Sequence, residues 1–237
     1  MLFFHHLTAV ASGFFRHYRH WTLGLSAVLV ITLIIASLRS LTYMQVLEAK
    51  TLDARFALNQ PPQNADQVVM IGIDDASLKF FGDNGVSWPW PRTFYAHVVD
   101  YLTRCGARAV LFDLLFYQPD LDRSESDGRE TDNAFAQAIA KNGHVILGAQ
   151  LSEDKLGFDT KMESVGLDSS FAELPMPSNY QSILAPIPSL SQAAAGLGII
   201  NIAADPDGII RKVPLVYGIG NKVLPQIAIA GYLFAGN

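Results

Sequence analysis

The chain has 237 residues, of which 50% are hydrophobic and 16% charged, a composition that fits a folded protein rather than a disordered one. This length accommodates one sizeable domain and an anchoring segment. The formal net charge is −5. Because residues 1–38 contribute only Arg16 and Arg19, the remainder carries 15 basic and 22 acidic residues, a net charge of −7. Such a surface repels phosphate backbones, so we expect no nucleic-acid partner.

Residues 21–38, WTLGLSAVLVITLIIASL, carry no charge over 18 positions, close to the roughly 20 residues needed to cross a bilayer. Arg16 and Arg19 precede this run, and every acidic residue lies at or after Glu48. The positive-inside tendency then predicts a cytoplasmic segment 1–20, a transmembrane helix 21–38 in the inner (plasma) membrane, and a body that is periplasmic or extracellular. The alternatives are a cleaved signal peptide, which the long apolar run and the missing A-x-A site disfavour, and a buried helix.

Residues 39–60 form the predicted juxtamembrane helix and linker. Helical character is expected over 40–58, and the proline pair in NQPPQN ends it. One face gathers Leu41, Met44, Leu52 and Phe56 around Glu48. The helix either docks on its own domain or acts as a stalk that transmits motion to the membrane.

Residues 61–237 are expected to form the main domain, of the α/β class. Apolar runs predict strands over 68–74, 107–116 and 144–151, and amphipathic stretches predict helices over 92–106 and 130–143. Alternating strands and helices favour a mainly parallel sheet flanked by helices. The strand 68–74 is expected to be buried on both faces.

The later sequence predicts a different arrangement. Residues 152–195 are less regular and include a proline-rich loop and a short helix within SLSQAAAG. Two strand-like runs around the turn DPDG, a second turn at GIGN and a closing helix from about residue 225 predict an antiparallel hairpin added to the sheet edge. DPDG lacks the ligand spacing of a calcium loop, so we interpret it as a turn.

Three aspartates follow the predicted strands. Asp74 and Asp75 end the first strand and Asp113 lies late in the second, where the crevice of a parallel sheet usually binds its ligands. Three interpretations are open: capping and ion pairing, a small-ligand or signalling pocket, and a metal-dependent catalytic site. Asp75 and Ser77 are good N-cap residues for the short helix ASLKFFG, which favours the capping interpretation.

The loop WPWPR follows, with Trp88, Trp90 and Arg92. The tryptophans either shape a crevice or are buried in the core. Arg92 opens the first crossover helix, and we predict that it pairs with one of the strand-end aspartates, Asp74 or Asp113 in the first place. Nucleophile and metalloprotease motifs, Walker loops and dinucleotide fingerprints are absent from the sequence. We therefore expect no enzymatic activity, no cofactor and no bound metal.

Several motifs together resemble a known family: LDARFAL after a membrane helix, VVMIGIDDASL, WPWPR, GARAVLFDLLF followed by PD, and GIINIAADPDGIIRKVPL. In this order, over about residues 47–237, they resemble the type-two CHASE domain, a cyclase- and histidine-kinase-associated sensory extracellular domain. The resemblance implies an extracytoplasmic input module of a bacterial receptor, which senses a ligand or protein and relays the signal to a cyclase or kinase.

No output domain follows the closing residues YLFAGN, and the family pattern normally continues, so a truncated sensory domain is expected. For such a receptor we expect a homodimer formed through the membrane and juxtamembrane helices. The alternative function is an extracytoplasmic metal-dependent α/β enzyme that uses the strand-end aspartates.

Overall fold

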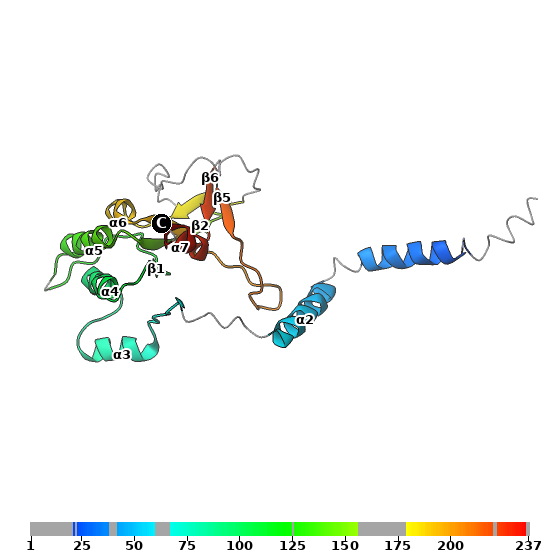
Figure 1. Cartoon of the computed structure of the whole chain (residues 1–237), viewed down its shortest axis with the longest axis horizontal. Coiled ribbons are helices and arrows are strands. Elements are labelled where there is room, and N and C mark those ends of the chain that lie inside the picture. Colours follow the sequence, from blue (N-terminus) through cyan, green and yellow to red (C-terminus); the bar gives the residue numbers. More distant parts are fainter. Residues whose placement is uncertain are drawn as a thin grey trace, which may run out of the picture. The chain divides into compact units, whose positions relative to one another are not determined.

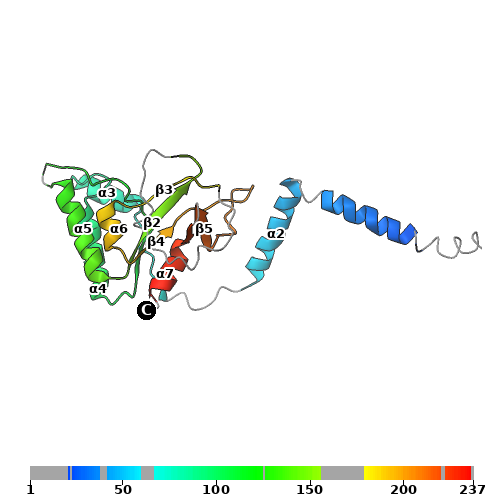
Figure 2. The same cartoon turned by 90° about the horizontal axis from the view of Figure 1, so that it is seen from above.

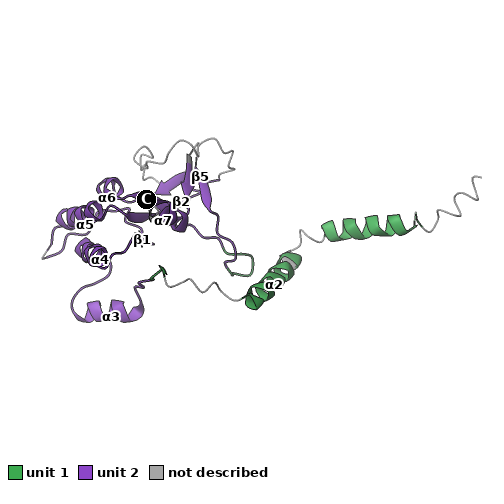
Figure 3. Ribbon diagram, in the orientation of Figure 1, with its two compact units in different colours: residues 1–69, 204–209 green, residues 70–203, 210–237 purple. Residues whose placement is uncertain are grey.

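The computed structural model describes residues 21, 23–37, 42–59, 67–124, 126–155, 179–219 and 222–235. The predicted cytoplasmic segment 1–20 lies outside the described residues, as do most of the linker after residue 59 and residues 156–178. The chain divides into two compact units, residues 1–69 with 204–209 and residues 70–203 with 210–237 (Figure 3).

The first unit is helical. Residues 23–37 form a helix, and α2 spans Thr42–Leu58, which confirms the helix predicted over 40–58. Across the described residues, no helix has both the length and the apolar character that spanning a membrane requires. The first unit also contains the turn at Ala204–Ile209.

The second unit is built on a mainly parallel sheet. β2 (Val145–Ser152) pairs in parallel with β1 (Val110–Phe112) and with β4 (Gly196–Ile199). β3 (Ser182–Leu184) pairs antiparallel with the last three residues of β2. The strand predicted over 144–151 is confirmed, the one over 107–116 is shorter than expected, and β3 lies in a stretch that we expected to be a loop.

Helices cover the sheet as the α/β class requires. α4 (Arg92–Arg104) and α5 (Gly128–Asn142) confirm the two predicted crossover helices, and α6 (Pro188–Ala193) confirms the short one. Phe112 of β1 packs on Phe135 of α5. The preceding residue, Leu111, lies against Gly231 of α7 (Ile227–Ala235). Because successive side chains of a strand point to opposite faces, α7 covers the face opposite α4 and α5 (Figures 1 and 2).

Aromatic residues form the centre of the core between α4, α5 and the sheet. The ring of Phe135 lies 5.5 Å from that of Phe112, 5.2 Å from that of Phe116 and 5.8 Å from that of Tyr95. Phe135 is fully buried. The contacts with Phe112 and Phe116 are edge-to-face, and such contacts stabilise a core beyond the burial of apolar area alone. These contacts hold α5 against β1.

The antiparallel hairpin forms at a different turn from the one expected. β5 (Val216–Ile219) and β6 (Lys222–Pro225) pair across residues 220–221, in the GIGN sequence, as a separate two-stranded sheet. DPDG does form a turn, with Gly208 N–H donating to the Asp205 carbonyl at 2.8 Å and Gly208 in the left-handed region (φ 81°). The run before this turn, however, is β4 of the parallel sheet, and the run after it has no strand structure before Val216.

The strand predicted over 68–74 is wrong. Residues 68–74 form no described strand, and Val68, Val69 and Met70 are 79%, 81% and 92% exposed. Apolar character alone does not form a strand, because a strand needs a neighbouring backbone to satisfy its N–H and C=O groups. In the described part of the chain, β1 pairs only with β2, so the run 68–74 has no neighbouring strand there. It leads instead into α3 (Asp75–Asp83), a helix without a buried residue (Figure 1).

Candidate functional site

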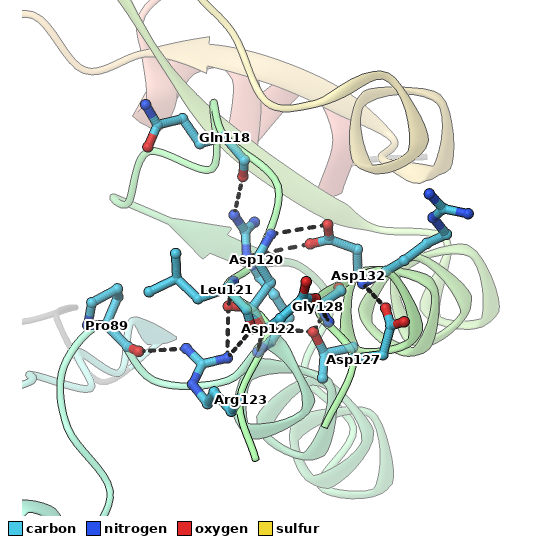
Figure 4. Close-up of polar contacts among 12 residues, drawn as sticks. Pro89, Gln118, Asp120, Leu121, Asp122, Arg123, Asp127, Gly128 and Asp132 are labelled. Carbon is cyan, nitrogen blue, oxygen red and sulfur yellow. Dashed lines mark hydrogen bonds and ion pairs between the residues drawn. The ribbon is translucent and has the colours of Figure 1, made fainter. Parts of the chain in front are cut away.

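The most connected polar site lies where α4 and α5 begin, beside the loop of residues 118–127 (Figure 4). α4 starts after Pro91, which provides no side-chain cap. The carboxylate of Asp120 takes that role from 28 residues away, because its Oδ2 accepts a hydrogen bond from Arg92 N–H at 2.8 Å. A negative charge at a helix N-terminus also compensates the positive end of the helix dipole. The loop is thus joined to the first crossover helix.

Asp120 is the most fully bonded carboxylate of the site. Its Oδ2 also accepts from Thr131 Oγ1 at 2.6 Å, and its Oδ1 accepts from Leu121 N–H at 2.8 Å and from Arg123 Nη1 at 3.0 Å. Burial by itself would raise the pKa of Asp120. The hydrogen bonds from Thr131, Arg92, Leu121 and Arg123 outweigh it and hold the pKa below its ordinary value. Asp120 therefore carries a full negative charge at neutral pH.

Arg92 is buried, with only 7% of the residue exposed. Its Nε lies 3.5 Å from Oδ1 of Asp132, its Nη2 donates to the Gln118 carbonyl at 2.5 Å, and its Cζ lies 4.6 Å from the centre of the Phe116 ring. Burial lowers the pKa of Arg92, and the nearby Asp132 and Asp120 oppose that shift. A guanidinium stays charged under such conditions.

The partner predicted for Arg92 is wrong. No ion pair joins Arg92 to Asp74, Asp75 or Asp113, all of which the structure describes. The prediction assumed that residues 68–74 form a strand ending beside the helix. Since that strand is absent, Asp74 caps α3, and α5 supplies the buried carboxylate through Asp132 instead.

Asp132 is the less satisfied of the two buried carboxylates. Oδ2 accepts from Asp120 N–H at 3.1 Å, but Oδ1 has no hydrogen-bond partner among the described residues. Burial raises the pKa of Asp132, with Asp120 N–H and Arg92 opposing the rise. Two buried donors, Trp90 Nε1 and Arg92 Nη1, likewise have no described partner. The site thus contains two buried donors and one buried acceptor without a described hydrogen-bond partner, which is rare for buried polar groups.

The start of α5 is shaped by close packing. Asp127 caps the helix through a 2.7 Å hydrogen bond from Arg129 N–H, and Asp122 Oδ1 accepts from Gly128 N–H at 2.9 Å. The backbone carbonyl of Asp120 lies directly against Gly128, where a Cβ atom would overlap it. Only glycine permits this approach without displacing the loop.

The tryptophans of WPWPR lie beside this cluster. Trp90 is buried, with its ring centre 4.5 Å from that of Phe81 in α3 and 6.1 Å from that of Phe94 in α4. Trp88 remains 48% exposed with its ring centre 5.4 Å from that of Trp90. Core burial, one of the two interpretations of the sequence, therefore describes Trp90, while about half of Trp88 remains accessible to solvent.

The same loop is fastened to the carboxylate cluster through one side chain. Arg123 Nη2 donates to the Pro89 carbonyl at 2.8 Å, while its Nη1 bonds Asp120. The ion pair between Arg123 and Asp120 has side chains that are 23% and 4% exposed. A displacement of residues 88–91 would therefore move Arg123 and alter its ion pair with Asp120.

The three strand-end aspartates do not gather. Asp74 is the N-cap of α3, where its Oδ1 accepts from Ser77 N–H at 2.8 Å and from Ser77 Oγ at 2.6 Å. The capping interpretation is confirmed in kind, although the cap is Asp74 rather than Asp75 or Ser77. Asp113 is exposed just after β1. In the described residues no three His, Cys, Asp or Glu side chains could together hold a metal ion, so the ligand set of the metal-enzyme alternative does not form.

Sequence reasoning missed Asp120, Asp132 and Arg123. Asp120 lies in the sequence PD, two residues after Gln118 and before a charged loop. Nothing in this local sequence indicated that Asp120 would cap a helix that begins 28 residues earlier. Asp132 could have been found, because helical spacing places it on the same face of α5 as the core residues Phe135 and Ile139. Its partner could not, since the pairing depends on how α4 and α5 cross.

Comparison with protein families identifies the chain. The model of the CHASE2 domain matches residues 28–235, and the chain belongs to this family of sensory extracellular domains. The expected resemblance to the type-two CHASE domain is therefore confirmed. The family is a sensory and not a catalytic one, so the chain is not classed as an enzyme. No significant match appears among curated proteins or among solved structures.

Proposed function

We propose that this chain is the membrane-anchored extracytoplasmic input module of a bacterial signal-transduction receptor. The observation that carries the proposal is the family match over residues 28–235, because CHASE2 is a family of sensory extracellular domains. The module binds a ligand or partner protein outside the membrane, and it relays the event through its N-terminal helices to an output domain such as a cyclase or kinase.

Membrane anchoring is supported by the sequence. Residues 21–38 are uncharged, Arg16 and Arg19 precede them, and the acidic residues all follow. In the proposed topology residues 1–20 are cytoplasmic, and the domain from residue 61 is periplasmic or extracellular. Two copies associate through the membrane and juxtamembrane helices, so that motion of one domain changes the packing of the pair.

A reporter enzyme that is active only outside the cytoplasm tests the topology. Fused after residue 160 it should be active, and fused after residue 20 it should be inactive. A cytoplasmic reporter should give the reverse pattern. Activity of the cytoplasmic reporter after residue 160 would overturn both the orientation and the sensory role.

The proposed ligand crevice is the WPWPR loop with Trp88, Trp90 and Arg92, and its floor is Asp132. Trp88 supplies exposed aromatic surface. Trp90 Nε1 and Arg92 Nη1 are unused donors, and Asp132 Oδ1 is an unused acceptor. A small molecule that accepts from the first two and donates to the third would satisfy all three, and it reaches them when residues 88–91 move aside. The sequence also placed Asp74, Asp75 and Asp113 at the crevice, but Asp74 caps α3 and none of the three pairs with Arg92.

A thermal-shift screen of the full chain in detergent tests the crevice, with a panel of small carboxylates and zwitterions as probes. A binding probe should raise Tm in the unmodified chain and lose the effect in Arg92→Lys, which keeps the charge but removes the planar fork. Arg104→Lys, at the far end of the same helix, is the control and should keep the effect. Equal loss in both variants, or no loss in either, would place the ligand elsewhere.

A further inference from the structure

We infer that the turn Ala204–Ile209 is the element that couples the α/β unit to helix α2. This inference rests on the proposed sensory function and specifies how its signal leaves the domain. The turn belongs to the compact unit that contains residues 1–69, yet residues 203 and 210 on either side of it belong to the α/β unit (Figure 3). The chain therefore connects the two units at three points, at residues 69–70, 203–204 and 209–210.

The turn has a defined conformation of its own. Gly208 N–H donates to the Asp205 carbonyl at 2.8 Å, Asp205 N–H donates to the Ile209 carbonyl at 2.9 Å, and Ile209 N–H lies 3.3 Å from Asp207 Oδ1. The positive φ of Gly208 closes the turn without steric cost. Asp207 is thereby presented at the tip of a short closed loop rather than on a freely varying chain.

The tip contacts α2. Asp207 Oδ2 lies 3.9 Å from Lys50 Nζ, and the same ammonium group lies 3.9 Å from Asp53 Oδ2 one turn along α2. The Asp207 side chain is only 15% exposed, whereas that of Lys50 is 58% exposed. Lys50 is largely solvated, and a 3.9 Å ion pair with one solvated partner contributes modestly to stability. A contact of that strength can be formed and released by small changes, as a signalling contact must be.

The base of the loop is fixed to the α/β unit much more firmly. The Asn201 side chain imitates a strand neighbour of Leu151, since its Oδ1 accepts from Leu151 N–H at 2.7 Å and its Nδ2 donates to the Leu151 carbonyl at 2.8 Å. The Tyr217 hydroxyl donates to the Asn201 carbonyl, and Ile200 N–H donates to the Ala149 carbonyl at 3.0 Å. Any shift at the end of β2 is therefore passed to residue 201, three residues before the turn.

The short loop is therefore attached in two places: to β2 through Asn201, and to α2 through Asp207. A change that moves the end of β2 would break or strengthen the Lys50–Asp207 contact before it disturbed the fold. α2 follows the proposed membrane helix in the chain, so a change in this contact would act on α2 directly rather than through residues 60–66. The interaction surface on α2 is the side that carries Lys50 and Asp53, and its partner is the DPDG turn of the same chain.

Crosslinking of the full chain tests the contact. In a Cys105→Ser background, Lys50→Cys with Asp207→Cys should be joined by a short bis-maleimide at least about tenfold faster than Arg55→Cys with Asp207→Cys. Arg55 is the matched control because five residues place it well round the helix from Lys50. Equal rates for the two pairs would overturn the inference, and so would a crosslink that joins two chains rather than one.

Coupling is tested by loosening the base of the loop in the same crosslinking assay. Asn201→Ala and the milder Tyr217→Phe should each change the rate for the pair at 50 and 207 by about threefold or more. Asn142→Ala, which removes an amide hydrogen-bonded to Thr103 Oγ1 elsewhere in the same unit, should leave the rate unchanged. Tyr217→Phe keeps the aromatic ring, so its crosslinking rate tests the coupling if the Asn201→Ala variant does not fold.

If neither loosening variant alters the rate, the turn touches α2 without being coupled to β2, and the inference fails. This outcome is distinguishable from failure of the proposed function. The crosslinking rates depend only on the contacts within the chain, whereas the topology reporters depend only on the side of the membrane on which residue 160 lies.

Discussion

Asp120 caps helix α4 through Arg92 N–H at 2.8 Å, although 28 residues separate the two positions. The same carboxylate bonds Thr131 of α5 and Arg123 of its own loop. One side chain therefore joins both crossover helices to the loop between β1 and α5. Loss of the Asp120 carboxylate should therefore weaken the contacts of both helices with this loop.

The first prediction concerns this carboxylate. Asp120→Asn removes the charge that compensates Arg123 and the α4 N-terminus, so it should lower the free energy of unfolding by roughly 3 kcal/mol, near the lower end of the range for breaking a buried ion pair. Urea unfolding of the full chain in detergent measures the change. Asp83→Asn is the matched control, because its ion pair with Lys79 is exposed, and it should cost less than about 1 kcal/mol. Similar losses in both variants would contradict the central role of Asp120.

The second prediction uses two glycines with opposite surroundings. Gly128→Ala places a Cβ atom against the Asp120 carbonyl, so it should destabilise the domain by about 1–3 kcal/mol, as overpacking does. Gly82→Ala in α3 meets nothing within 4 Å and should stabilise slightly, by up to about 1 kcal/mol, because alanine is the better helix former. Denaturant midpoints of the two variants should therefore move in opposite directions. A stabilised Gly128→Ala variant would show that the loop does not lie on α5.

The third prediction concerns pH and the lowered pKa of Asp120. A carboxylate whose folded pKa lies below its unfolded pKa stabilises the fold above the unfolded value, and the contribution disappears as the pH falls through the folded value. Acidification below about pH 4 should therefore destabilise the unmodified chain more steeply than Asp120→Asn. Stability measured at a series of pH values from 6 to roughly 2 checks this slope. Parallel curves for the two proteins would contradict it.

The fourth prediction concerns Asp132, whose pKa is shifted in the opposite direction. A raised folded pKa contributes stability that is complete below the unfolded value, and this stability is lost as the pH rises through the folded value. The stability of the unmodified chain relative to Asp132→Asn should therefore decline as the pH increases upward from 3.8, the ordinary pKa of an aspartate carboxyl. Asp100→Asn is the control, because the pKa of Asp100 is lowered by its bond with Lys141. A relative stability that rises over this window would reverse the assigned sign.

The fifth prediction separates the two tryptophans. Trp90→Ala removes a buried ring that contacts Phe81 and Phe94 and should cost roughly 3–5 kcal/mol. Trp88→Ala, which removes a ring 48% exposed, should cost much less. Chemical unfolding gives both values, and protease sensitivity of residues 75–83 should rise in Trp90→Ala alone, because Phe81 holds α3 to this ring. A larger cost for Trp88→Ala would mean that the exposed ring is the structural one.

The sequence alone determined the class of the fold and most of its helices. Amphipathic spacing in residues 92–106 and 130–143 gave α4 and α5, and Gly143 closed the second of them with φ 78°. Those signals are local, since capping residues and periodicity act within one or two turns of the chain. The order of the quoted motifs also sufficed to indicate the family, which the match over residues 28–235 established.

The tertiary structure decided which residues meet. The apolar run at residues 68–74 has every local feature of a buried strand, yet strand formation depends on a neighbouring backbone that the sequence of the run does not contain. The buried Arg92 pairs with Asp132 rather than with Asp74 or Asp113, because the crossing of α4 and α5 brings Asp132 next to it. The Asn201 amide, likewise, acquired its role only because β2 ends beside it. Pairing energies of this kind arise between segments distant in the chain, where local pattern carries no information about the partner.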